Sequence, residues 1–378
     1  MTPIPFNKPY LTGAENALLD QVLSSGKLSG DGAMTKACQA ELERRLGSGR
    51  ALLTTSCTDA LEAAALLCDI EPGDEVIVPS YTFVSTANAF ALRGATIVFA
   101  DSREDHPNID TGGIHDLITE RTRAIVPVHY AGMACDMDTL STLAEGKGIR
   151  IVEDAAQAID SFYKGKALGT LGDLAAFSFH ETKNIVAGEG GSLHINDPAL
   201  VKRAEIVREK GTDRSAFFRG EVDKYGWVSL GSSYLPSELV AAVLLAQLRA
   251  LEDIQQQRRS VWAAYDQRMR VLEQDGHVRC PVVPEGATNN AHMYYILTAD
   301  LDERDALLDH LRGEGVMAVF HYQALHCSRY FEERHDGRDL PNAVRFTETL
   351  VRLPLYAGLS EAEIDRVCAA VENFYRSR

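Results

Sequence analysis

The chain has 378 residues, of which 45% are hydrophobic and 24% charged, values that are ordinary for a globular enzyme. Its length exceeds what one small core needs, so we expect one large domain and a smaller one. The formal net charge of −16 argues against nucleic acid as a partner, although a small anionic substrate could bind where basic residues are concentrated.

No apolar run approaches the roughly 18 residues that cross a membrane, and the segment MTPIPFNKPY lacks the basic and apolar regions of a secretory signal. We therefore expect no contact with a membrane. The seven cysteines are odd in number and form no CxxC pair, which argues against a disulfide framework and a zinc site. We expect reduced thiols in a cytoplasmic protein and no bound metal.

Residues 1–250 alternate between helical and strand patterns, which is typical of βαβ units. Short apolar runs predict strands at 75–79, 96–100, 124–128, 149–154 and 174–179. Helical patterns lie before or between them, at 14–23, 35–46, 59–67, 82–92 and 136–145. Because β-branched runs bounded by turns indicate strands buried on both faces, the sequence predicts a mostly parallel sheet covered by helices.

Residues 237–270 predict one long helix or two, and the character of the sequence changes after Pro281. The last part combines strand patterns at 291–300 and 316–322 with helical patterns at 302–313, 342–351 and 360–375. We therefore divide the chain into a large α/β domain, residues 1–255, and a smaller α+β C-terminal domain, residues 256–378.

An acidic residue and a lysine follow two of the predicted strands. Asp154 ends the strand at 149–154, and Lys183 lies in the polar turn HETKN after the strand at 174–179. Open α/β sheets bind their ligands at such strand ends. Pyridoxal phosphate needs a lysine to hold it as a Schiff base and a carboxylate to keep its ring nitrogen protonated. Alone, Asp154 could be a helix N-cap and Lys183 a solvated surface residue, but together they predict a pyridoxal-phosphate enzyme.

The segment TTSCT precedes the helix at 59–67. Ser56, Cys57 and Thr58 would offer backbone N–H groups and hydroxyls at a helix N-terminus, which is a natural phosphate site. Plain helix capping is the simpler interpretation of the same residues. Cys57 has no basic neighbour in sequence, so we expect it to pack rather than to act as a nucleophile.

Three further residues could contact the same cofactor. Phe83 opens the helix at 82–92 and could stack on a flat ring, although an aromatic residue there is more often part of a core. Gln157 lies one helical turn beyond Asp154 and could reach the ring hydroxyl, while Ser178 could reach the phosphate. The run GEGG after Lys183 allows the backbone to reverse closely behind the cofactor, or is simply a tight turn.

These motifs together resemble the DegT/StrS-type sugar-nucleotide aminotransferases, which have the fold-type I pyridoxal-phosphate architecture. The likeness covers nearly the whole chain in the expected order, with the segments SGKLSGDG, TTSCTDALE, PGDEVIVPSYTFVSTANA, VPVHYAGMACDMD, VEDAAQA, FSFHETKN, GEGG and GSSYLPSELVAA. Within that group the chain is most similar to TDP-4-keto-6-deoxyglucose 4-transaminases, through FSFHETKN, EKGTDRSAFFRGEVDKY and AVFHYQALH.

The resemblance implies a role for each candidate. It makes Lys183 the Schiff-base lysine, Asp154 the partner of the ring nitrogen and Gln157 the contact to the ring hydroxyl. It makes Phe83 the stacking aromatic, and assigns phosphate contacts to Cys57, Thr58 and Ser178. Many relatives read GYNYR where this chain reads GSSYL, so Ser233 replaces the asparagine that reaches the phosphate in a neighbouring subunit.

The implied reaction transfers an amino group from L-glutamate to carbon 4 of TDP-4-keto-6-deoxy-D-glucose, giving a TDP-4-amino-4,6-dideoxy sugar and 2-oxoglutarate. The diphosphate of such a substrate needs cations, and Lys210, Arg214 and Arg219 cluster in EKGTDRSAFFRG. A solvated basic loop is the alternative for this cluster. His321 could meet sugar hydroxyls or have a structural role. By resemblance, the enzyme is a homodimer with site residues from both subunits.

Other functions remain possible from the sequence. The same cofactor chemistry could serve a different keto sugar nucleotide, and the fold could belong to a non-catalytic regulatory protein. A dehydratase of the same group would have a histidine in place of Lys183. A nicotinamide dehydrogenase would need GxGxxG after its first strand, and the sequence has none there.

Overall fold

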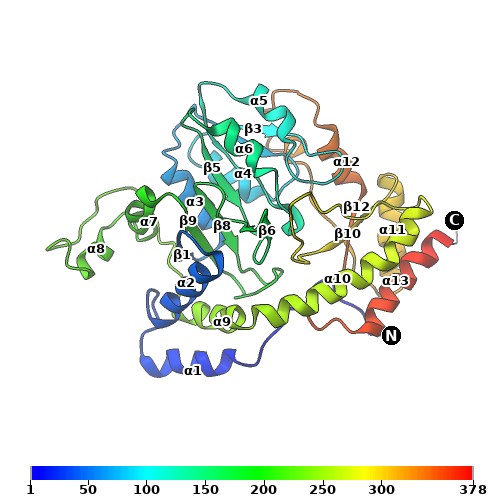
Figure 1. Cartoon of the computed structure of the whole chain (residues 1–378), viewed down its shortest axis with the longest axis horizontal. Coiled ribbons are helices and arrows are strands. Elements are labelled where there is room, and N and C mark those ends of the chain that lie inside the picture. Colours follow the sequence, from blue (N-terminus) through cyan, green and yellow to red (C-terminus); the bar gives the residue numbers. More distant parts are fainter. Residues whose placement is uncertain (1, 377–378) are drawn as a thin grey trace.

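A seven-stranded sheet forms the centre of the computed structural model, which describes residues 2–376 (Figure 1). The strand order is β1-β9-β8-β5-β4-β2-β3. All neighbours pair in parallel except β9, which is antiparallel to β1 and β8, so the mostly parallel sheet expected from the sequence is confirmed. The strands are β1 (Arg50–Thr54), β2 (Glu75–Pro79), β3 (Thr96–Ala100), β4 (Thr122–Ile125), β5 (Arg150–Asp154), β8 (Leu174–Ser178) and β9 (Gly191–Ile195).

Helices cover both faces of this sheet, because successive strand residues point to opposite sides. In β1, Leu52 packs into one hydrophobic core, whereas Ala51 and Leu53 pack into the other. The first face carries α3 (Cys57–Leu67), α4 (Val84–Ala91) and α7 (Val201–Arg208). The second carries α1 (Glu15–Ser25), α2 (Ala33–Leu46), α5 (Ile114–Leu117), α6 (Met137–Ala144) and α9 (Glu238–Arg249). A short hairpin of β6 (Phe162–Tyr163) and β7 (Lys166–Ala167) lies outside the main sheet.

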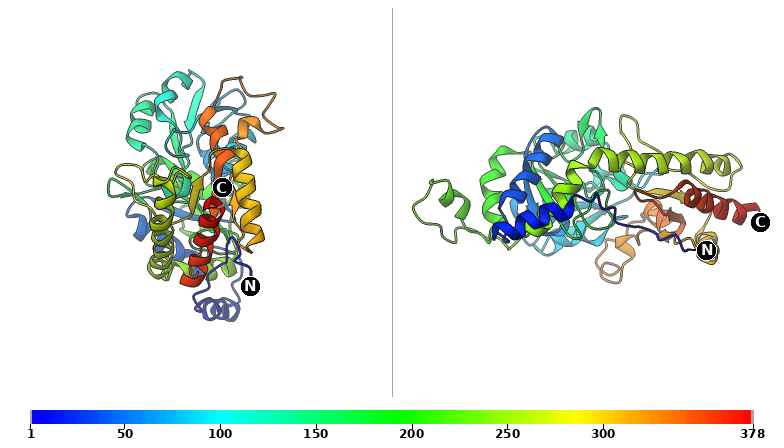
Figure 2. Two further views of the ribbon diagram at one scale, coloured as in Figure 1. Left: turned by 90° about the vertical axis from the view of Figure 1, so that its right-hand side faces the viewer. Right: turned by 90° about the horizontal axis from the view of Figure 1, so that it is seen from below.

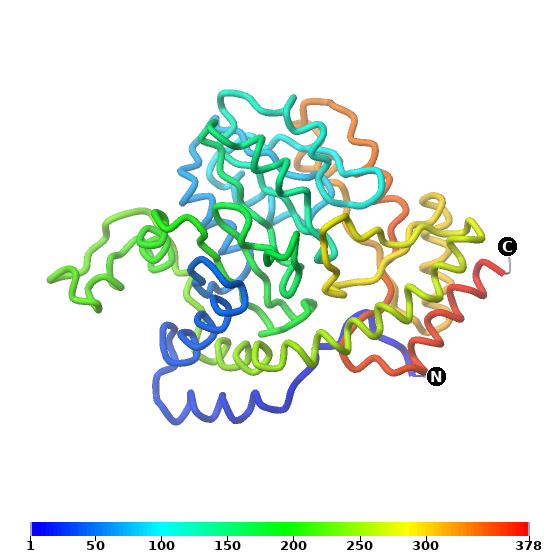
Figure 3. Tube along the Cα trace, viewed as in Figure 1, coloured from blue at the N-terminus to red at the C-terminus, as the bar shows by residue number. Residues whose placement is uncertain are grey.

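The C-terminal part contains a smaller antiparallel sheet in the order β10-β12-β11. Its elements are α10 (Leu251–Gln274), β10 (Tyr294–Leu297), α11 (Leu301–Gly313), β11 (Val319–Phe320), α12 (Pro341–Thr349), β12 (Leu350–Leu353) and α13 (Glu361–Arg376). Figure 3 shows α10 running from beneath the large sheet to the smaller one. Residue 255 lies within α10, so the division into 1–255 and 256–378 stays a prediction.

One detail differs from the sequence-based expectation. The helix expected at 342–351 ends at Thr349, and the chain continues as β12, the central strand of the smaller sheet. Pro354 follows this strand, and the residue before a proline is driven toward extended backbone, which favours strand over helix there. For the region 237–270 the sequence left one helix or two open, and the structure has two, because the helical path breaks at Ala250.

An arm, which we define as residues 209–233, projects from the large domain and carries α8 (Arg214–Phe218) (Figure 1). The right-hand view of Figure 2 shows the arm at one end of an elongated molecule and both chain termini at the other. Large apolar side chains of the arm face solvent, with Phe218, Tyr225 and Trp227 exposed by 71%, 52% and 81%. Within residues 2–376, no helix has both the length and the apolar character needed to cross a bilayer.

Gly191, the last residue of GEGG, begins β9 where this strand meets the start of α3. A Cβ atom at Gly191 would lie 2.4 Å from the carbonyl carbon of Ser56 and 2.5 Å from the backbone nitrogen of Cys57. Such distances are far below van der Waals contact, so only glycine allows β9 and α3 to approach this closely. At neighbouring Gly190 the nearest atom would be 3.5 Å away, which is ordinary contact.

We therefore expect Gly191→Ala to lower the free energy of unfolding by about 3 kcal/mol, because backbone atoms must shift to admit the methyl group. Gly190→Ala is the matched control and should change it by less than about 1 kcal/mol. Chemical denaturation of the two variants checks this. Equal effects would contradict the packing argument.

Candidate active site

A cavity of about 540 Å³ lies where β5 and β8 end and where α3 and α4 begin. At this edge of a parallel sheet, strand ends and helix N-termini face the same space. Side chains from the smaller sheet and its loops close the opposite wall. The predicted site residues that line the cavity are Cys57, Thr58, Phe83, Asp154, Gln157, Ser178, Lys183 and His321.

Asp154 is the last residue of β5 and is only 5% exposed. The Thr86 hydroxyl donates to its Oδ2 at 2.7 Å, and the Ala156 N–H donates to its Oδ1 at 3.1 Å. Burial raises the pKa of the Asp154 carboxyl, while these two hydrogen bonds and the nearby Lys183 ammonium oppose the rise. The carboxylate is thus held in place and directed into the cavity, as a partner for a cationic ring nitrogen must be.

Lys183 follows β8 in a tight turn, in which its N–H donates to the His180 carbonyl at 2.9 Å. Burial lowers the pKa of the Lys183 ammonium, with Cys57 and Asp154 acting in the opposite direction. The lowered pKa increases the fraction of free amine, which is the form that attacks a carbonyl and accepts a proton. The next residue, Asn184, is buried and fixes the turn through hydrogen bonds to Gln255 and His292.

The start of α3 and the start of α4 lie side by side. The Ser56 hydroxyl caps α3 by accepting from the Asp59 N–H at 3.0 Å, and the hydroxyls of Thr58 and Ser85 are 2.8 Å apart. Two helix N-termini and these hydroxyls suit a phosphate. Burial raises the pKa of the Cys57 thiol well above its usual value, so this residue stays neutral.

Three more predicted residues complete the cavity. Gln157 is fixed by the Ala131 N–H, which donates to its Oε1 at 2.6 Å, and its Nε2 donates to the Tyr322 hydroxyl at 3.3 Å. Phe83 is 55% exposed at the cavity, with its ring centre 6.1 Å from that of Tyr322. Ser178, at the end of β8, is 8% exposed. With a lysine, a buried carboxylate and an anion site, this donor set fits pyridoxal phosphate.

His321 lies on the wall opposite the sheet. Its Nδ1 is 2.9 Å from the Tyr130 hydroxyl. Burial lowers the pKa of His321 well below its usual value, and the Arg352 and Lys183 charges add to this shift. A neutral imidazole beside the cavity can exchange hydrogen bonds with hydroxyl groups without carrying a charge.

Sequence reasoning missed Thr86, His292, Tyr322 and Arg352, all of which either line the cavity or hold a residue that does. Thr86 lies one helical turn after Phe83, a spacing that could have suggested a contact to the same ligand. Arg352 is a single cation in the apolar run LVRLPLY, which is a signal for a buried charge.

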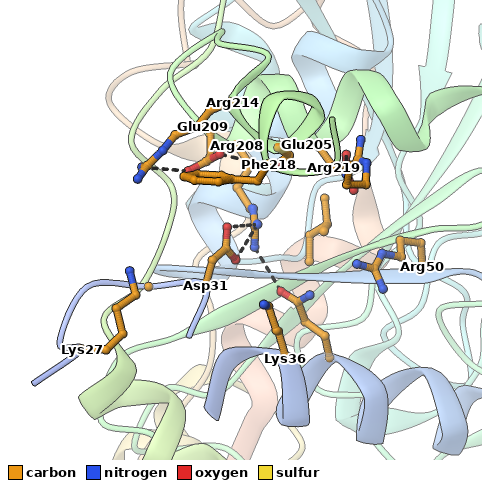
Figure 4. Close-up of a pocket in the computed structure, with 14 residues that line it drawn as sticks. Lys27, Asp31, Lys36, Arg50, Glu205, Arg208, Glu209, Arg214, Phe218 and Arg219 are labelled. Carbon is orange, nitrogen blue, oxygen red and sulfur yellow. Dashed lines mark hydrogen bonds and ion pairs between the residues drawn. The ribbon is translucent and has the colours of Figure 1, made fainter. Parts of the chain in front are cut away.

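The basic cluster of the arm lies at a second cavity, of about 430 Å³, rather than at the first (Figure 4). Arg219 pairs there with Glu205 at 2.8 Å and Glu221 at 2.7 Å. Arg214 lies 3.6 Å from Glu209. The basic residues that line this cavity are Lys27, Lys36, Arg50, Arg208, Arg214 and Arg219.

Two other predicted contacts also lie on the arm. Lys210 is exposed, with a backbone φ of 64°, and Ser233 is exposed beside it through a β-bridge to Glu209. Within one chain, therefore, the structure does not bring Ser233, Lys210, Arg214 or Arg219 to the cavity that holds Lys183.

A sequence profile of the DegT/DnrJ/EryC1/StrS aminotransferase family matches residues 9–372. The chain belongs to this family. This aminotransferase is similar over 99% of both chains to TlmJ from Streptoalloteichus hindustanus, with 32% identity and a TM-score of 0.91. It is similar over the full length of both chains to S. venezuelae DesV, with 32% identity and a TM-score of 0.90.

The sugar aminotransferase Spr1654 from Streptococcus pneumoniae, solved in its PLP form, has 27% identity and a TM-score of 0.90 over 99% of both chains. The family and these structures confirm the expected fold, enzyme class and cofactor: this chain is a pyridoxal-phosphate-dependent sugar aminotransferase.

The Thr86 hydroxyl provides a test of how hydrogen bonding affects the pKa of Asp154. Thr86→Val keeps the shape but removes a hydrogen bond to the charged carboxylate, so the pKa of Asp154 should rise further. Since the carboxylate form is the active one, the low-pH limb of kcat/KM should move up by about one to two pH units.

The pH–rate profile of Thr86→Val checks this shift. Thr139→Val is the control, because it removes a similar hydrogen bond, to Asp136 at 2.6 Å, outside the cavity. The control should leave the low-pH limb of kcat/KM unchanged. An unshifted limb in Thr86→Val would exclude Asp154 as the group that titrates there.

Proposed function

We propose that this aminotransferase transfers an amino group from L-glutamate to carbon 4 of TDP-4-keto-6-deoxy-D-glucose. The products are a TDP-4-amino-4,6-dideoxy sugar and 2-oxoglutarate. The observation that carries the chemistry is the pairing, in one cavity, of Lys183 with its lowered pKa and the buried carboxylate of Asp154. The choice of sugar rests on the segments FSFHETKN, EKGTDRSAFFRGEVDKY and AVFHYQALH.

Pyridoxal phosphate, when bound, supplies an electron sink that stabilises negative charge on the carbon next to the transferred nitrogen. Asp154 would hold the proton on the ring nitrogen. The phosphate would lie against Cys57, Thr58 and Ser178, with Gln157 at the ring hydroxyl. Phe83 would cover one face of the ring and exclude water from it.

Lys183 would then move the proton that transamination requires. In the first half of the cycle its Nζ takes the proton from the α-carbon of the amino donor. In the second half it delivers a proton to carbon 4 of the sugar. A lysine with a lowered pKa suits both steps, because it exchanges protons readily near neutral pH.

The decisive assay mixes the protein with pyridoxal phosphate, L-glutamate and TDP-4-keto-6-deoxyglucose, and follows the product by proton NMR. We expect a new 4-amino sugar, and a coupling at its carbon-4 proton that is small for a galacto and large for a gluco product. Lys183→Ala is the negative control and should lower the rate at least 10⁴-fold, by about the full contribution of acid–base catalysis.

Consumption of glutamate without a 4-amino sugar would leave the aminotransferase in place and reject this substrate. Activity retained in Lys183→Ala would reject the assigned roles.

All seven cysteines are free thiols, which supports a reducing compartment and hence the cytoplasm as the place of this reaction.

We further propose that the enzyme works as a homodimer and that the arm reaches the cofactor cavity of the partner subunit. Ser233 would then approach the phosphate there, and Lys210, Arg214 and Arg219 the diphosphate of the sugar nucleotide. Two observations support this. No arm residue lines the cavity that holds Lys183, and the apolar side chains of Trp227 and Phe218 on the projecting arm are exposed, as side chains that a second copy covers would be.

Mixed dimers test whether the arm acts across the interface. One variant is Lys183→Ala with an intact arm, and the other combines Arg214→Ala and Arg219→Ala with an intact Lys183. Mixing the two should restore about a quarter of the wild-type rate, since half of the dimers are mixed and each has one complete cavity. No recovery would mean that the arm serves its own chain.

A further inference from the structure

Arg352 is a buried arginine without a partner. It lies in β12, is 8% exposed and borders the cavity that holds Lys183. Among residues 2–376, no side chain or carbonyl forms a hydrogen bond or an ion pair with it, and its Nε is both buried and unbonded. Its one described contact is with the ring of Phe6, whose centre lies 4.7 Å from the guanidinium.

A second buried arginine shows what a satisfied guanidinium looks like in this protein. Arg258, 2% exposed, donates to the carbonyl of Ala291 at 3.1 Å and to that of His292 at 2.7 Å. Arg352 has no such acceptors. Because a buried charge without a partner is strongly destabilising, a site that retains one has a strong preference for an anion.

The residues around Arg352 do not supply that anion. Its electrostatic neighbours are the hydroxyls of Tyr81, Tyr130 and Tyr322, and burial raises the pKa of each phenol, which keeps it neutral. His292 and His321 also line the cavity, and the pKa of each is lowered well below its usual value. The cavity wall at this point is therefore cationic, and an incoming ligand has to provide the negative charge.

We propose that Arg352 binds the α-carboxylate of the amino donor, so that the first substrate is recognised as an α-amino acid. This inference rests on the proposed function only in requiring an amino-acid donor. It does not depend on which sugar accepts the amino group.

The connectivity of the two substrates favours the carboxylate. Lys183 must reach the carbon whose proton it removes, and the α-carboxylate is bonded directly to that carbon. In a sugar nucleotide, by contrast, the diphosphate is bonded through oxygen to carbon 1, across the ring from carbon 4. Arg352 and Lys183 line the same cavity, so an anion held by Arg352 would lie near the reacting carbon.

The fold fixes the backbone of Arg352 and covers its side chain. Arg352 pairs with Tyr295 of β10 and Val319 of β11, so it occupies the middle of the central strand. Phe6, from the N-terminal segment, covers its guanidinium. A fixed, planar guanidinium can form two parallel hydrogen bonds to a carboxylate at little cost in side-chain entropy.

The test compares Arg352→Gln and Arg352→Lys with the wild type. Arg312→Gln is the matched control, because Arg312 is on α11 of the same part of the chain, is 71% exposed and pairs with Asp309. In single-turnover reactions with L-glutamate alone, Arg352→Gln should raise the apparent Kd about 100-fold, and Arg352→Lys about 10-fold. Arg312→Gln should match the wild type.

A readout that needs no turnover is the binding of glutarate, an unreactive dicarboxylate, measured by calorimetry on the cofactor-loaded protein. The wild type should bind glutarate, and Arg352→Gln should bind it about 100-fold more weakly. Binding of TDP should change less than about threefold, because the diphosphate does not use Arg352.

Two outcomes would overturn the inference. Weaker TDP binding with unchanged glutarate binding would assign Arg352 to the diphosphate. An equal loss of cofactor, glutarate and TDP binding in both Arg352 variants would make the residue structural. If the wild type reacts with glutamate but not with TDP-4-keto-6-deoxyglucose, only the proposed sugar fails, and the glutarate comparison still decides the role of Arg352.

Discussion

The cofactor cavity depends on a buried, hydrogen-bonded pair of side chains directly behind it. Glu153 and His129 are both fully buried, and the Glu153 carboxylate lies 2.8 Å from His129 Nε2. The Cys135 N–H donates to His129 Nδ1 at 3.2 Å, so Nε2 carries the ring proton and donates it to the Glu153 carboxylate. Burial lowers the pKa of His129, whereas its hydrogen bonds with Cys135 and Glu153 raise it. Glu153 also accepts hydrogen bonds from the N–H groups of Gly169, Leu171 and Gly172.

This hydrogen-bonded pair sets the direction of the next residue. Because neighbouring residues of a strand point to opposite faces, fixing Glu153 on one side of β5 directs Asp154 to the other. The backbone N–H of His129 donates to the carbonyl of Asp154 at 3.1 Å, which ties the ends of two strands together. The Glu153 carboxylate therefore stabilises the fold, whereas the Asp154 carboxylate faces the cavity and takes part in the chemistry. The low-dielectric surroundings of Glu153 also strengthen the electrostatic interactions of Asp154.

The sequence allows much of the large domain and its cavity to be predicted, because the relevant signals are local. Strand ends at Asp154 and Ser178 and helix starts at Cys57 and Phe83 can be read from short apolar runs and their boundaries, and in a parallel sheet these ends meet at one edge. These signals did not reveal the strands at 50–54 and 191–195. These two strands form one side of the sheet, where the strand at 191–195 is antiparallel to its neighbours.

What the sequence could not show is pairing between distant segments. Arg352 lies 169 positions after Lys183, in a strand whose first two residues were assigned to the predicted helix at 342–351, so its place in the cavity follows only from the fold of the smaller sheet. The arm shows the opposite limit. Its charges are obvious in the sequence, but whether they serve their own cavity or a partner's depends on the path of the backbone.

The long helix α10 has a consequence for how the enzyme moves. Gln255 and Arg258 stand near its start and hold Asn184, beside Lys183, and the carbonyls of Ala291 and His292. This helix of 24 residues therefore contacts both walls of the cavity, the turn that carries Lys183 and the backbone at His292. A shift of α10 would move these two walls together, which couples the position of the lysine to that of the smaller sheet.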